Sequence, residues 1–127
     1  MLCNAIRQSS RLAQHGRLSR GTSVRCMASA AQAPTYHILS YSYVKDILEK
    51  RGPYREAHLA AAQAKADQGL MVMAGAVGSP PEGATFIFRN QSQQDIEAFV
   101  QADPYVKNGL VTSWKVSPYT VVVKGQL

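Results

Sequence analysis

Cysteine is scarce in this 127-residue chain, and residues 35–127, which we call the body, contain none. Cys3 and Cys26 both lie in the first 34 residues, which we call the arm. The absence of thiols excludes disulfides, thiolate catalysis and cysteine-ligated metal from the body. The length of the chain allows one domain.

Acidic residues are missing from the arm, which nevertheless holds five of the 14 lysines and arginines of the chain. An arginine- and serine-containing segment without acids or a continuous apolar run is typical of an organellar transit peptide. We therefore expect residues 1–34 to be a disordered transit peptide and linker, for import into a chloroplast rather than a mitochondrion. The alternative is a basic tail with no targeting role.

Long hydrophobic runs are also missing, because no apolar stretch approaches the ~20 residues that span a bilayer. The body is nearly neutral, with nine basic and eight acidic residues, whereas a nucleic-acid partner would need a concentrated cationic face. The body has no glycine-rich phosphate loop, nucleophile elbow or zinc pattern. We expect no membrane, nucleic acid, cofactor or metal.

The pattern of the body predicts an α+β domain with the order β-α-β-β-α-β-β. Gly69 should end a first long helix, whose buried stripe would be Leu59, Ala62 and Ala66. Ser92 should cap a second helix. This order indicates a ferredoxin-like fold with an extra C-terminal strand and both helices on one face of an antiparallel sheet. The expected strands are residues 36–43, 70–77, 84–88, 110–116 and 119–123, and the helices are 53–68 and 92–103.

Several strands have apolar residues on both faces. Val72 alternates with Met71 and Met73, and Ile87 lies between two phenylalanines. Two helices can cover only one face of the sheet, and monomers seldom expose a large apolar patch. We therefore expect a homodimer in which sheet faces sheet.

Three motifs follow one another along the body: RGPYREAHL at residues 51–59, GLMVMAG at 69–75 and DPYVKNGLV at 103–111, followed by Trp114 and Pro118. In this order and at these separations they resemble the YCII-related domain family, and the resemblance covers nearly all of the body. The resemblance implies a dimeric α/β barrel similar in fold to muconolactone isomerase, and one branch of the family performs dehydrochlorination in aromatic degradation.

The resemblance implies that a catalytic pair falls on His58 and Asp103. His58 lies within about 40° of Ala62 around the helix, at the edge of the predicted stripe, from where it could reach a cleft. A carboxylate bonded to Nδ1–H would fix the imidazole tautomer, which suits proton abstraction and return. The alternatives are a histidine bonded to a backbone carbonyl, and an Asp-Pro helix terminator that accepts backbone hydrogen bonds.

Arg51 and Arg55 approach the same side of the helix as His58 and could bind a substrate carboxylate, unless they are merely solvated. Tyr105 could form the wall of the pocket. Gly75 should allow a close backbone approach on its strand. A metal site that joins His37 to His58 is conceivable, but nothing in the spacing requires it.

These features predict a small cofactor-independent enzyme of the isomerase, lyase or dehydrochlorinase type, acting on a small polar or anionic metabolite. The alternative is a non-catalytic dimer that binds a small molecule or a partner on the same scaffold. RNA binding ranks last, because GATFIF at residues 83–88 lacks the leading basic residue of RNA-recognition strands.

Overall fold

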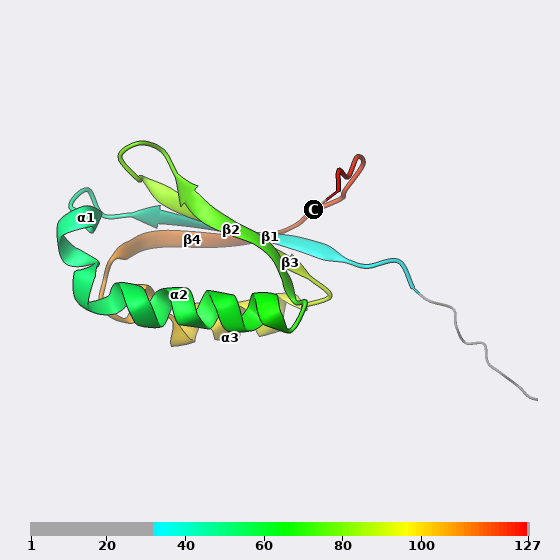
Figure 1. Ribbon diagram of the computed structural model, residues 1–127, viewed down its shortest axis with the longest axis horizontal. Helices are drawn as coiled ribbons and strands as arrows, with labels where there is room; N and C mark the ends of the chain where they lie inside the picture. The colour runs from blue at the N-terminus through cyan, green and yellow to red at the C-terminus, as the bar shows by residue number, and fades with distance from the viewer. Residues whose placement is uncertain (1–31, 127) are drawn as a thin grey trace, which may run out of the picture. The chain divides into compact units, whose positions relative to one another are not determined.

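The computed structural model describes residues 32–126, so residues 1–31 of the predicted transit peptide lie outside the described part. No helix within residues 32–126 is long and apolar enough to cross a bilayer. Figure 1 shows the two long helices, α2 and α3, on the same side of one sheet. The elements are β1 (Tyr36–Tyr43), α1 (Ile47–Lys50), α2 (Gly52–Asp67), β2 (Met71–Val77), β3 (Gly83–Arg89), α3 (Gln93–Ala102), α4 (Pro104–Lys107) and β4 (Val111–Pro118).

The four strands form a sheet in the order β2-β3-β1-β4, with every neighbouring pair antiparallel. The predicted ferredoxin-like α+β fold is confirmed. The prediction of an extra C-terminal strand over residues 119–123 was wrong, because β4 ends at Pro118 and residues 119–126 form no strand. Tyr119 N–H still donates to the Tyr36 carbonyl at 3.0 Å. Tyr36 is the first residue of β1, so the segment after Tyr119 has no strand beside it to pair with.

The core lies between the sheet and the two long helices. Alternate residues of the central strands, Leu39 and Tyr41 in β1 and Phe86 and Phe88 in β3, are at most 4% exposed. Opposite them, α3 buries the predicted residues Ile96, Phe99 and Val100.

The start of α3 agrees with its sequence signal. The Ser92 hydroxyl accepts the Asp95 N–H at 3.1 Å, and the Asp95 carboxylate accepts the Ser92 N–H at 3.1 Å. This reciprocal capping box satisfies two backbone donors at the helix start.

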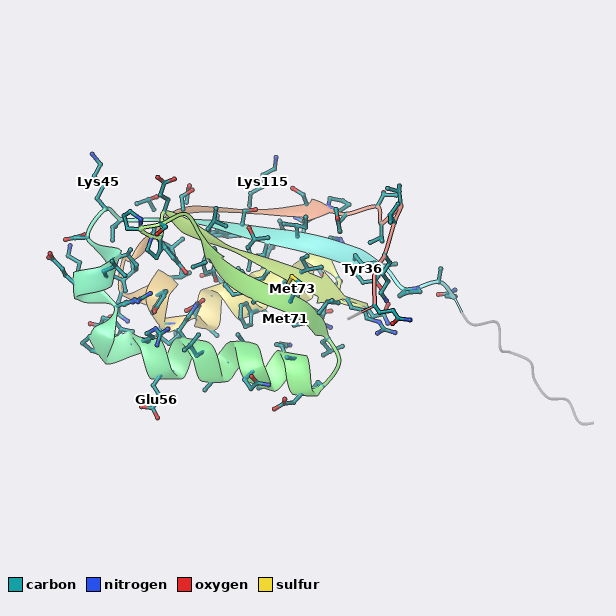
Figure 2. The ribbon with its side chains drawn as sticks, turned by 45° about the horizontal axis from the view of Figure 1, so that its top comes forward. Tyr36, Lys45, Glu56, Met71, Met73 and Lys115 are labelled. Atoms are coloured by element: carbon teal, nitrogen blue, oxygen red, sulfur yellow. The ribbon has the colours of Figure 1, made fainter. Side chains whose placement is uncertain are left out.

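The two methionines of β2 lie on different faces of the sheet, although strict alternation places them together. Met71 stands opposite Phe88 and is buried, whereas Met73 stands opposite Ile87 and is 49% exposed. The pairing register shifts between them, because a β-bulge adds one residue to β2. Figure 2 labels both side chains, together with Lys115 on β4, which points away from the helices.

The buried stripe of α2 differs from the predicted one. Its buried residues are His58 and Ala62, whereas Leu59 is 47% exposed and Ala66 is also exposed. An imidazole can occupy the inward position because its polar atom has a buried partner, described below. Leu59 instead lies at the open side of the helix, over the space between α2 and β2.

The close backbone approach expected at Gly75 occurs at Gly83 instead. A Cβ atom added to Gly75 would meet nothing within 4 Å, whereas one added to Gly83 would collide with the Tyr41 carbonyl. Gly83 therefore allows β3 to lie against β1, and Gly75 leaves open space beside the site described next.

Candidate active site

Asp103 connects α3 to α4, and its side chain is almost completely buried. Its backbone is extended, with φ −71° and ψ 124°, as expected for a residue before proline. This conformation ends α3 and turns the carboxylate back to the start of α4, where Oδ1 accepts the Tyr105 N–H at 2.9 Å. Asp103 therefore is the predicted helix terminator that accepts a backbone hydrogen bond. Its carboxylate also contacts a second side chain, His58.

His58 points from α2 to the same carboxylate. Its Nδ1 lies 2.9 Å from Asp103 Oδ1 and 3.0 Å from Oδ2, and the residue is 5% exposed. An ionised carboxylate can only accept, so Nδ1 carries the proton facing Asp103, and in the neutral imidazole the lone pair is then on Nε2. The predicted approach of these two residues is confirmed, and their catalytic role stays a prediction.

A third donor to Asp103 was not anticipated from the sequence. The Tyr41 hydroxyl, on the inner face of β1, donates to Oδ2 at 2.9 Å. Strand alternation predicts that Tyr41 points inward, but nothing in the sequence indicates its partner, 62 residues away.

Two aromatic rings contact the imidazole and hold it in place. The Tyr105 ring lies parallel to the His58 ring, with 3.8 Å between centroids and 4° between planes. Phe86 meets the imidazole edge-on at 6.0 Å. Since Asp103 also caps the helix that carries Tyr105, the same carboxylate positions the imidazole and the ring stacked on it.

The imidazole lines a cleft of about 150 Å³ between α2 and the sheet. The structure brings Arg51, Arg55 and Tyr105 to this cleft, as the sequence predicted, and adds Tyr43 and Phe86. The lining contains two arginines and no carboxylate. Among residues 32–126, neither guanidinium forms an ion pair and no group hydrogen-bonds His58 Nε2. The cleft is therefore cationic, and within the described residues His58 Nε2 has no hydrogen-bond partner.

The tyrosines around the site retain their protons. Burial, with smaller contributions from Tyr105 and Asp103, raises the pKa of Tyr43 to about 12. Burial also raises the pKa of Tyr41, and the negative charge of Asp103 adds to that effect. Both hydroxyls are therefore available as hydrogen-bond donors at neutral pH.

The conceivable metal site at His37 is not assembled in the described part of the chain. Within residues 32–126, no three histidine, cysteine or acidic side chains lie close enough together to hold a metal ion.

Comparison with known proteins places this chain in a family. Residues 35–120 match the model of the YCII-related domain. The proteins named YciI from Escherichia coli and from Shigella flexneri are each 38% identical to this chain over 86 residues. That match covers 61% of this chain and 88% of each relative.

A solved structure shares the fold. The 5-chloro-2-hydroxyhydroquinone dehydrochlorinase from Burkholderia phenoliruptrix, in complex with 2,5-dihydroxybenzoquinone, matches with a TM-score of 0.58 at 19% identity. The match covers 67% of this chain and 93% of the dehydrochlorinase. The family match and this fold are compatible with a small enzyme-like protein. The chain belongs to the YCII-related domain family.

Proposed function

We propose that the protein is a small cofactor-independent enzyme in which His58 and Asp103 carry out acid–base chemistry on a small anionic metabolite. One observation carries the proposal: Asp103 holds His58 by Nδ1, and His58 lines a cleft with two arginines that form no ion pair within residues 32–126. A buried carboxylate behind an imidazole fixes its tautomer and stabilises the imidazolium that forms when Nε2 takes a proton.

The reaction class follows from what one imidazole can do. Nε2 would accept a proton from a substrate C–H or O–H group, and the electron pair would stay on the substrate as an enolate or leave with a departing anion. The imidazolium would then return the proton to another atom or to water. Isomerisation, lactone chemistry and elimination of an acid all need this step, and a positioned general base contributes about 10²- to 10⁴-fold to such rates.

The charge and size of the cleft restrict the substrate. Arg51 and Arg55 favour an anion: a guanidinium can bind a carboxylate through two parallel hydrogen bonds, and it can also donate to the single oxygen of a phenolate or enolate. A volume of about 150 Å³ equals that of an engineered cavity that holds a benzene molecule. A single-ring or smaller anion therefore fits. The dihydroxybenzoquinone in the dehydrochlorinase complex is a probe of this class.

The test is hydrogen–deuterium exchange in small activated acids, followed by NMR in D₂O. A panel of enolic and β-keto carboxylates, with 2,5-dihydroxybenzoquinone, reports proton abstraction whatever the net reaction is. We expect the wild type to exchange at least one member, and His58→Gln to slow that exchange by about 10²-fold or more. Binding of panel members without His58-dependent exchange would instead establish the non-catalytic binding protein.

A further inference from the structure

Tyr41 has no contact with the cleft, yet its hydroxyl is directed at the centre of the site. The residue is 4% exposed, and its ring packs edge-on against Phe86 at 4.9 Å between centroids. A phenylalanine would fill the same space and make the same ring contact. The hydroxyl adds one interaction among the described residues, its 2.9 Å hydrogen bond to Asp103 Oδ2.

The hydrogen bonds of Asp103 show what that hydroxyl contributes. Oδ1 is held by the Tyr105 N–H, Oδ2 is held by the Tyr41 hydroxyl, and His58 Nδ1 lies between the two oxygens at 2.9 and 3.0 Å. The donors come from α4, β1 and α2, so the carboxylate plane is fixed from three directions. The torsion that turns an aspartate carboxylate is intrinsically broad. Removing the Tyr41 hydroxyl leaves Oδ2 with only the longer of the two contacts to His58.

We propose that Tyr41 is a positioning residue of the site: its buried hydroxyl holds the Asp103 carboxylate in the orientation that keeps the proton on His58 Nδ1. This inference rests on the proposed function, because it assigns Tyr41 to the same His58–Asp103 pair. Hydrogen bonds to charged groups are about twice as strong as neutral ones, so one donor is enough to fix the plane. The raised pKa of Tyr41 described above keeps that donor protonated through neutral pH.

The test compares Tyr41→Phe with Tyr36→Phe in the full-length chain. Tyr36 lies on the same strand, but among residues 32–126 its hydroxyl contacts only Lys124 Nζ, at 3.4 Å. In ¹⁵N-labelled protein, we expect the wild type and Tyr36→Phe to show one His58 tautomer with a slowly exchanging Nδ1 proton. In Tyr41→Phe we expect that proton to exchange about 10-fold faster or more, with both ring nitrogens broadened. Unchanged His58 signals in a folded Tyr41→Phe chain would overturn the proposal.

A measurement on the wild type covers the case in which Tyr41→Phe does not fold. With tyrosines labelled at ¹³Cζ, a buried and hydrogen-bonded hydroxyl in an equal mixture of H₂O and D₂O gives two resolved signals. We expect a doublet for Tyr41 and a single averaged line for Tyr36. A single line for Tyr41 would refute the fixed hydroxyl. These readouts need no turnover, so they can support Tyr41 as a positioning residue even where the exchange assay finds no catalysis.

Discussion

The Nδ1 atom of His58 lies 2.9 Å from Asp103 Oδ1, although 45 residues separate them in the chain. The contact depends on two local features, an inward-facing position on α2 and an Asp-Pro turn that ends α3. Because both residues are buried, the imidazole proton and the carboxylate must satisfy each other. Substituting either residue should therefore change both the free energy of unfolding and the proposed proton transfer.

Replacing Asp103 by asparagine should reverse the hydrogen bond to His58. An amide NH₂ facing Nδ1 makes that nitrogen an acceptor, so the proton moves to Nε2 and the base in the cleft is lost. We expect His58-dependent proton exchange to fall by about 10²- to 10⁴-fold, with the tautomer change visible in ¹⁵N NMR. The asparagine oxygen cannot serve both Tyr41 and the Tyr105 N–H, so urea unfolding should show a loss of about 1–3 kcal/mol. An unchanged tautomer would contradict this prediction.

Removing the charge of Arg55 should weaken the binding of small anions. Arg55→Gln keeps a polar side chain at the mouth of the cleft but removes one of its two cations. We expect the dissociation constant of 2,5-dihydroxybenzoquinone, measured by calorimetry, to rise about 10-fold or more, because hydrogen bonds to charged groups contribute about 1.5–3 kcal/mol. Lys115→Gln is the matched control, since Lys115 points away from the helices (Figure 2). Equal weakening in both variants would indicate a general charge effect.

Raising the pH above 10 should destabilise the fold through tyrosines of the site whose pKa is raised. Tyr43 has a pKa of about 12 in the fold against 10.0 unfolded, so the folded state binds its proton more tightly. Its stabilising contribution is complete below pH 10 and is lost as the pH rises from 10 through 12. Urea unfolding at increasing pH should therefore show falling stability over this interval. Tyr43→Phe should lose less stability over the same interval, and identical curves would exclude Tyr43 as a cause.

Most helices and strands could be predicted from the sequence, but the side-chain faces of α2 and β2 were predicted wrongly. The helix boundaries at Gly69, Ser92 and Asp103-Pro104 could be predicted, because local backbone chemistry determines them. The buried face of α2 could not be predicted, because an alanine-rich helix has only a weak apolar stripe. His58 can face inward only because Asp103 lies beside it as a buried partner. The bulge in β2 and the Tyr41 hydrogen bond depend on pairings distant in sequence, which no local pattern encodes.

We propose that residues 1–34 direct the chain into an organelle, that this arm is shortened on import, and that the body folds without it. The first strand begins at Tyr36, and the hydrogen bonds between Thr35 and Asn90 join the entering chain to the end of β3. A chain beginning at Ala33 should therefore melt at the temperature of the full-length protein. A reporter carrying residues 1–34 should accumulate in chloroplasts or mitochondria in shortened form. A markedly lower melting temperature would show that the arm belongs to the fold, and a reporter left in the cytosol would exclude targeting.

We further propose that the protein is a homodimer through the sheet face that the helices leave uncovered. On that face Met73 stands opposite Ile87, and Met73 and Val77 are 49% and 50% exposed. A second copy is the natural occupant, because the body is nearly neutral and a self-complementary apolar patch has the same chemistry on both partners. Light scattering at micromolar concentration should therefore give twice the monomer mass.

An aspartate at Met73 would place a charge without a partner in such an interface, which is costly. Met73→Asp should thus give monomers or lower the melting temperature in a concentration-dependent way. Ala60→Asp is the matched control, since Ala60 is an exposed position of α2, and α2 lies on the other side of the sheet (Figure 1). A wild-type monomer at all concentrations, or a Met73→Asp chain that stays dimeric, would rule out this interface and leave the exposed methionine as an ordinary surface residue.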